Sequence, residues 1–154
     1  MNGFDAAIES IYSAALGGGA WSGAIDRFCD AIGSRGLIVN PVRLDRPGML
    51  LFSDDLLSAV EDYERHWRPR DPRVRAGLQQ KVGEGIVTDR VLGISEADRA
   101  RDPFYQEFLR PIDIGCFAAY VYRTADGQVY SVSAQRELGR GEFGESELTD
   151  IVRL

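Results

Sequence analysis

Two strand-like runs near the end of the chain constrain its fold more than any other feature. Residues 116–123 and 128–135 are typical of β-strands, and Thr124-Ala125-Asp126-Gly127 separates them. Asp-Gly favours a tight hairpin turn, because both residues accept the positive backbone φ angles that such a turn needs. The second run alternates between two faces, one of them more polar: Val129, Ser131 and Ser133 against Tyr130, Val132 and Ala134. The chain therefore contains a long antiparallel hairpin.

Helical patterns dominate the rest of the chain. Apolar residues at helical spacing predict a helix over about residues 4–15 and a second over about 20–32, which ends at Gly33. Ser53 is a good N-cap for a third helix, which Pro69 ends. The residues expected to face the core are Phe4, Ile8, Ile11, Tyr12 and Ala15 in the first helix, Trp21, Ile25, Phe28, Cys29 and Ile32 in the second, and Leu56, Val60, Tyr63 and Trp67 in the third.

Capping patterns mark the shorter helices. Asp71-Pro72 and Asp102-Pro103 each place an Asp cap before a Pro, which suits the first helical position. Ser95-Glu96-Ala97-Asp98 resembles a short capped turn. A last helix begins near Glu145, with Leu148, Ile151 and Val152 as its apolar residues.

Three shorter strands are expected before the hairpin. Residues 37–39 and 49–52 predict a strand pair joined by a turn at Pro47-Gly48, and residues 85–88 predict a brief strand. This gives about five strands, mostly antiparallel, with helices packed outside them. We therefore expect an α+β fold, a PAS/GAF-like α/β/α sandwich, formed by residues 1–154 as a single domain.

Composition limits the class of protein. The chain has 154 residues, is 44% hydrophobic and carries a net charge of −6, which excludes a disordered chain and argues against a domain that binds nucleic acid over its whole surface. Cys29 and Cys116 lie among apolar residues and are expected to be buried free thiols. No signal peptide and no membrane-spanning stretch are visible, so we expect a cytoplasmic protein with no membrane contact.

Catalytic motifs are absent from the sequence. There is no G-x-S-x-G, no Walker loop, no C-x-x-C and no H-E-x-x-H. His66 is the only histidine and is expected to be exposed or to cap a helix. Cys29, Cys116 and His66 have no metal-ligand spacing. We therefore expect neither an enzyme, nor a metal site, nor a cofactor.

Five arginines fall within eleven residues: Arg65, Arg68, Arg70, Arg73 and Arg75. They could contact an anion or nucleic acid, or lie at a dimer interface. They could also form a solvated face balanced by nearby acids, and the net negative charge favours that interpretation.

The most specific pattern is YERHWRPRDPRV, residues 63–74, in which Tyr63, Trp67 and Asp71 are each four residues apart and Pro72 follows. Together with DPFYQEFLRP at 102–111 and the closing GRGEFGESELTDIVRL, it resembles the N-terminal sensor domain of LuxR-type transcriptional regulators. The resemblance covers essentially the whole chain. It implies a ligand-sensing domain that controls a C-terminal helix-turn-helix DNA-binding domain, which this chain lacks; DNA would be bound only through that domain. We also expect the chain to form a homodimer.

The resemblance also implies a ligand site. In the branch that binds acyl-homoserine lactones, the aromatic residues of this helix and the Asp before Pro line the pocket, and only Tyr63, Trp67 and Asp71 carry over. Two tryptophans of that branch are missing: Ser58, Ala59 or Val60 stands in place of one, and Ile86 and Val87 in place of the other. A different apolar or aromatic small molecule is therefore the expected ligand.

The expected ligand-binding residues fall into three groups. Tyr63, Trp67, Phe104 and Phe108 would form apolar walls, Asp71 the polar anchor, and Phe117 or Tyr130 the floor on the sheet. The same aromatic residues could instead be plain core, and Asp71 could be only an N-cap. The chain would then be a pocketless PAS-like dimerisation module, with the Phe4 stripe and the last helix as its interface.

Overall fold

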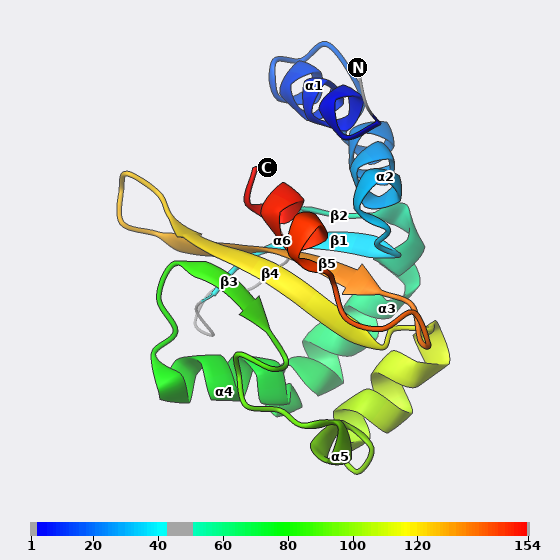
Figure 1. The fold of residues 1–154 in the computed structure, drawn as a ribbon, viewed down its shortest axis with the longest axis vertical. Coiled ribbons are helices and arrows are strands. Elements are labelled where there is room, and N and C mark those ends of the chain that lie inside the picture. The colour runs from blue at the N-terminus through cyan, green and yellow to red at the C-terminus, as the bar shows by residue number, and fades with distance from the viewer. Residues whose placement is uncertain (1–2, 43–50, 154) are drawn as a thin grey trace.

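An antiparallel sheet forms the centre of the molecule (Figure 1). The computed structural model describes residues 3–42 and 51–153. The strand order is β2-β1-β5-β4-β3, and the strands are β1 (Gly36–Pro41), β2 (Leu51–Phe52), β3 (Gly85–Thr88), β4 (Cys116–Arg123) and β5 (Val129–Arg136). The predicted α+β class is confirmed. About five strands were expected; the sheet has four longer strands, β1, β3, β4 and β5, and the two-residue β2 only extends its edge beside β1.

The predicted hairpin is present as β4 and β5. Gly127 has a φ of 84°, and its N–H donates to the Thr124 carbonyl across the turn. Ala119 pairs with Ser133, and Val121 pairs with Ser131. Since side chains alternate across a strand, this register sends the more polar face of β5 to the same side of the sheet as Ala119 and Val121.

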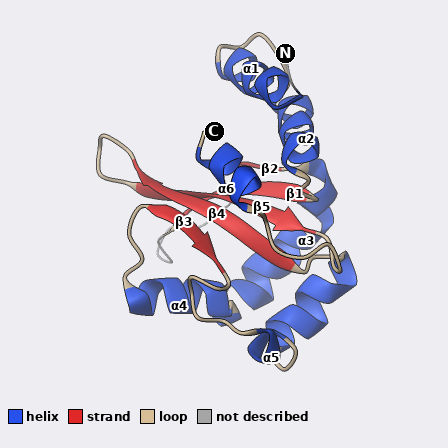
Figure 2. Ribbon diagram, in the orientation of Figure 1, coloured by secondary structure: helices blue, strands red, loops and turns tan. Residues whose placement is uncertain are grey.

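Helices lie on both faces of the sheet (Figure 2). One face is covered by α2 (Trp21–Ile32) and α6 (Glu145–Val152), and α1 (Gly3–Ala15) packs further out, against α2. The other face carries α3 (Leu57–Asp62), α4 (Pro72–Gln80) and α5 (Glu96–Arg99), together with η4 (Phe104–Leu109). The first face has one continuous core, with Phe28, Ala118 and Ile151 among its members. The second face has two smaller apolar clusters.

The predicted inward stripe of the first helix is wrong in part. Phe4 is buried, but Tyr12 is 63% exposed and Ala15 is also exposed, whereas Ala7 and Ala14 are buried. Because α1 packs against a single helix, it buries only a narrow stripe. In the last helix Val152 is likewise 44% exposed, although Ile151 is buried as expected.

The third helix departs from its prediction at both ends. Ser53 occupies the N-cap position of a 3-10 turn, η1 (Asp54–Leu56), that leads into α3. Its hydroxyl makes no cap hydrogen bond and instead accepts one from the Leu37 backbone N–H, 3.1 Å away. The helical backbone also runs past Pro69, through a π-helical segment η2 (Tyr63–Trp67) and a 3-10 turn η3 (Arg68–Arg70). Proline has no N–H for the carbonyl four residues earlier, so the backbone changes its hydrogen-bonding period there. The same Arg-Pro sequence follows the π-helical segment η4.

Several smaller predictions can be compared with the structure. Cys29 and Cys116 are buried and are not joined in a disulfide, and the His66 side chain is 64% exposed beside Asp62. Ser95 and Asp98 form a capping box at α5. The predicted turn at Pro47-Gly48 and the first half of the predicted strand 49–52 lie outside the described residues. None of the helices that the structure describes is long and apolar enough to cross a membrane.

Candidate ligand-binding cavity

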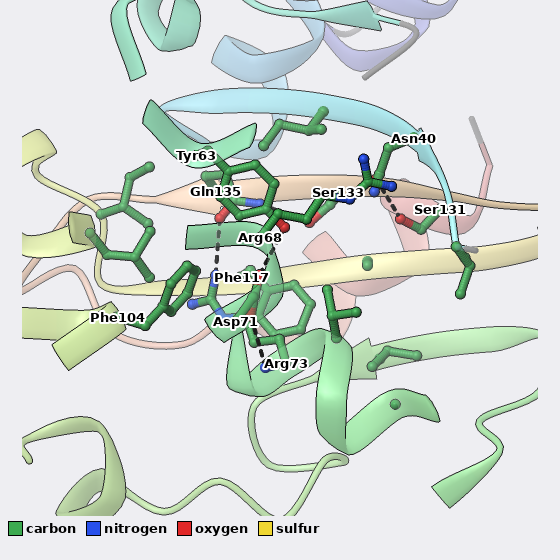
Figure 3. A pocket seen from close by; sticks show the side chains of 18 of the residues that line it. Asn40, Tyr63, Arg68, Asp71, Arg73, Phe104, Phe117, Ser131, Ser133 and Gln135 are labelled. Carbon is green, nitrogen blue, oxygen red and sulfur yellow. Dashed lines mark hydrogen bonds between the residues drawn. The ribbon is translucent and has the colours of Figure 1, made fainter. Parts of the chain in front are cut away.

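A cavity of about 180 Å³ lies between the sheet and the helices of the second face (Figure 3). Its floor comes from the face of the sheet that carries Phe117, Ala119, Ser131, Ser133 and Gln135, with Ile38 and Asn40 from β1. Its roof comes from α3, η2, α4 and η4. Most of the lining is apolar. Its polar side chains lie in two places, one around Asp71, Arg73 and Gln135 and the other at Asn40 and Ser131. This arrangement is typical of small-molecule sites.

Aromatic rings form one wall of the cavity. The Tyr63 ring stacks on Phe108, with centroids 5.8 Å apart, and meets the edge of Phe104 at 6.4 Å. Trp67 packs behind them, stacked on Phe108 at 5.6 Å, and does not line the cavity. The helical spacing of Tyr63 and Trp67 and the π-helical segment η4 bring these rings together from two distant parts of the chain.

Asp71 is the buried acid of the cavity. Only 6% of the residue is exposed. Its Oδ1 accepts a hydrogen bond from the Arg73 backbone N–H at 2.8 Å, which confirms the N-cap prediction, and its Oδ2 accepts one from the Tyr63 hydroxyl at 3.0 Å. Burial raises the pKa of Asp71 above its ordinary value, although the Arg73 guanidinium and the hydrogen bonds lower it in part. One side chain thus caps α4 and faces the cavity.

The Tyr63 hydroxyl remains protonated next to this acid. Burial raises the pKa of Tyr63, and the negative charge of Asp71 raises it further. The hydroxyl therefore acts as a donor, and it holds the Asp71 carboxylate in one orientation.

Arg73 is the second buried charge of the cavity. Its guanidinium lies 4.2 Å from the centre of the Phe117 ring. Nε and Nη2 donate to the Asp89 carboxylate at 3.1 and 3.4 Å, and Nη1 donates to Gln135 Oε1 at 3.3 Å. Tyr105 donates its hydroxyl to Asp89 Oδ1 at 2.6 Å. These bonds join α4, η4, β5 and the segment after β3 through one buried side chain.

The solvated-face interpretation of the arginine-rich stretch is therefore wrong for Arg73. Arg73 is 9% exposed. Burial alone would lower the pKa of its guanidinium, but Asp89, Tyr105 and Asp71 together outweigh burial and raise it. Arg65, Arg70 and Arg75 are exposed, as that interpretation predicts. Arg68 is only partly buried; it pairs with Glu64 at 2.9 Å and lines the cavity.

The other polar groups lie on the floor of the cavity. Gln135 donates to the Ser133 hydroxyl at 2.7 Å, and the Ser131 hydroxyl donates to Asn40 Oδ1 at 3.0 Å. Figure 3 shows Gln135 near Tyr63 and Arg73, with Asn40 and Ser131 further along the sheet. Ser131, Ser133 and Gln135 lie on the more polar face of β5 that the sequence alternation indicated, and Asn40 comes from the neighbouring β1.

Five of the seven residues predicted to bind a ligand line this cavity: Tyr63, Asp71, Phe104, Phe108 and Phe117. Trp67 lies one layer behind. Tyr130 does not reach the cavity, because it occupies the opposite face of β5 and stacks on Tyr122 at 5.9 Å. Its aromatic ring suggests a place on the cavity floor, but the alternation of β5 places it on the face opposite Ser131. Arg73 was missed, and no local pattern distinguishes it from the exposed arginines beside it.

The described residues contain no group of three His, Cys, Asp or Glu side chains that could hold a metal ion. Comparison of the chain with protein-family models, with curated proteins and with solved structures finds no match.

Proposed function

We propose that this chain is the small-molecule sensor domain of a LuxR-type transcriptional regulator, with a PAS/GAF-like α/β/α architecture. The observation that carries the proposal is the cavity between the sheet and α3–α4, with an aromatic wall and one buried carboxylate. A buried charge is costly, and an N-cap can be exposed or uncharged. A ligand that uses Asp71 as its anchor explains why the cap is an acid that faces a cavity.

Ligand binding would act on an attached DNA-binding domain by shifting a two-state equilibrium. A ligand shifts such an equilibrium only if its affinity differs between the two states. The position of the cavity supports such a shift. Its walls come from α4, η4 and the sheet, and a bound ligand would fix the positions of these elements relative to one another. The ligand we propose is a small apolar or aromatic molecule.

The alternative function, a pocketless dimerisation module, has less support. The core of the second face contains a cavity. The Phe4 ring, proposed as part of its interface, is 7% exposed and packs on Phe28 with centroids 5.9 Å apart.

Homodimer formation remains part of the sensor proposal, and light scattering tests it. A dimer would have twice the chain mass of 17.0 kDa.

A ligand screen by thermal shift and native mass spectrometry tests the sensor function. We expect at least one compound to raise the Tm of the wild-type chain, since a ligand that binds only the folded state stabilises it. The Asp71→Asn variant should lose most of this shift. Asp102→Asn is the matched control, because Asp102 caps a helix before Pro103 in the same way, accepting from the Phe104 N–H at 2.8 Å, but does not line the cavity.

The screen can also reject the proposal. If no compound of a diverse library binds the wild-type chain, the sensor function is wrong. If Asp71→Asn and Asp102→Asn respond alike, the ligand does not use Asp71 as its anchor.

A further inference from the structure

The size of the cavity limits what it can hold. An engineered cavity of about 150 Å³, lined by Leu, Ile and Phe, binds benzene. The cavity described here has about 180 Å³ and a similar aromatic and aliphatic lining. It therefore has room for one aromatic ring with a small substituent.

The buried charges limit the charge of the ligand. Asp71 and Arg73 line the same cavity, and each is at least nine-tenths buried. Arg73 pairs with Asp89, which also contacts Arg99 at 3.5 Å; Arg68 pairs with Glu64. An anionic ligand would be desolvated beside Asp71, and a cationic ligand beside Arg73. Since an uncompensated charge is costly to bury, the cavity favours an uncharged molecule.

The two charged side chains also present complementary hydrogen-bonding groups. Asp71 accepts from the Tyr63 hydroxyl and from the backbone N–H groups of Arg73 and Val74. A carboxylate has about four acceptor positions, which leaves room for one more donor. Arg73 has five N–H groups, and its bonds to Asp89, Tyr105 and Gln135 use Nε and one N–H of each terminal nitrogen. One N–H on each terminal nitrogen remains for an acceptor.

We propose that the cavity binds an uncharged molecule with one aromatic ring and a polar group that both donates and accepts a hydrogen bond. Asp71 accepts the hydrogen bond from that group, and Arg73 donates one to it. A phenolic hydroxyl or a primary carboxamide has this chemistry. The proposal rests on the proposed sensor function and makes Arg73 a second recognition residue.

Calorimetric titration of the full chain with defined probes tests this ligand class. 4-Methylphenol and benzamide carry the proposed group. 4-Methylanisole lacks the donor, benzoate is an anion, benzylammonium is a cation, and decanamide has the same amide on a long chain. We expect at least one of the first two to bind about tenfold more tightly than each of the other four, the effect of one hydrogen bond or more.

Two variants test the role of Arg73. Arg73→Lys keeps the charge but removes the planar fork, so it should weaken binding of the preferred probe about tenfold. Arg75→Lys, on the exposed side of α4, should leave the affinity unchanged. If Arg73→Lys does not fold, the comparison between 4-methylphenol and 4-methylanisole on the wild-type chain still tests the hydrogen-bonding group.

Failure of this inference differs from failure of the sensor function. If a charged probe, 4-methylanisole or decanamide binds as tightly as the preferred probes, the ligand class is wrong while sensing stands. If none of the probes binds but the wider screen finds a ligand, the ligand class is again wrong. If neither the probes nor the screen gives a binder, both proposals are overturned.

Discussion

At the scale of single residues, the Arg73–Asp89 pair holds the second face of the molecule together. The Arg73→Met variant removes the guanidinium and leaves Asp89, 2% exposed, with the hydrogen bond from the Tyr105 hydroxyl and only the longer ion pair with Arg99. Breaking a buried ion pair in this way costs about 3–5 kcal/mol. We expect a loss of this size in the free energy of unfolding, measured by urea denaturation. Arg75 is an exposed arginine on the same helix, so Arg75→Met should change the free energy of unfolding little. Equal losses in both variants would contradict the structural role of Arg73.

A second residue, Glu147, makes stability depend on pH. Partial burial alone would raise the pKa of Glu147, but hydrogen bonds from Arg136 and from the Gly144 N–H outweigh it and lower the pKa. The stabilisation is therefore complete above the pKa of an unfolded glutamate, about 4.3, and is lost as the pH falls through the lower folded-state value. Glu147→Gln should reduce this acid-dependent loss in urea titrations at several pH values, whereas Glu145→Gln, at an exposed position, should retain it.

The sequence could reveal residues whose partners are close in the chain. Asp71 caps the helix that begins beside it, and Tyr63, its side-chain donor, is eight residues away. Arg73 could not be found in this way, because Asp89, Tyr105 and Gln135 are 16, 32 and 62 residues away. Only the folded sheet and helices bring these residues together. In the sequence, therefore, nothing distinguishes Arg73 from the exposed arginines near it.

At the scale of secondary-structure elements, helix α2 has one glycine inside it and another at its C-cap, with opposite roles. Gly33 ends the helix with a φ of 62°, where a residue with a Cβ costs about 1–2 kcal/mol. Gly23 lies inside the helix with open space around it, where alanine is better than glycine by about 0.5–1 kcal/mol. Gly33→Ala should therefore lower the free energy of unfolding, and Gly23→Ala should raise it, in paired urea melts. A change of the same sign in both would contradict the described end of α2.

Most of the elements were predictable because their signals are local. The Asp-Gly hairpin and the helix starts at Asp71 and Glu145 depend on residues within one turn. The π-helical segments η2 and η4 were not predicted, since an Arg-Pro sequence indicates only that the α-helical bonding stops, not how the backbone continues. The face that Tyr130 occupies follows from strand alternation, which places it opposite Ser131 whatever the size of its ring.

At the scale of the whole molecule, the two faces of the sheet differ in packing. The face under α2 and α6 has one continuous core, whereas the face under α3 and α4 is divided by a cavity of about 180 Å³. A cavity costs stability, so its presence beside a buried carboxylate favours a binding role. No sequence pattern shows a cavity, because core and pocket are lined by the same aromatic residues.

The central claim is that this cavity is the ligand site, and a cavity-filling variant tests it most directly. Ala119 is 4% exposed on the floor of the cavity, so Ala119→Leu places a larger side chain in the space for the ligand. The measurement is the ligand-induced rise in Tm of the wild-type chain and of Ala119→Leu, each with the compound that stabilises the wild-type chain most. We predict that the variant folds and that the compound no longer raises its Tm. An equal rise in both chains would contradict the claim.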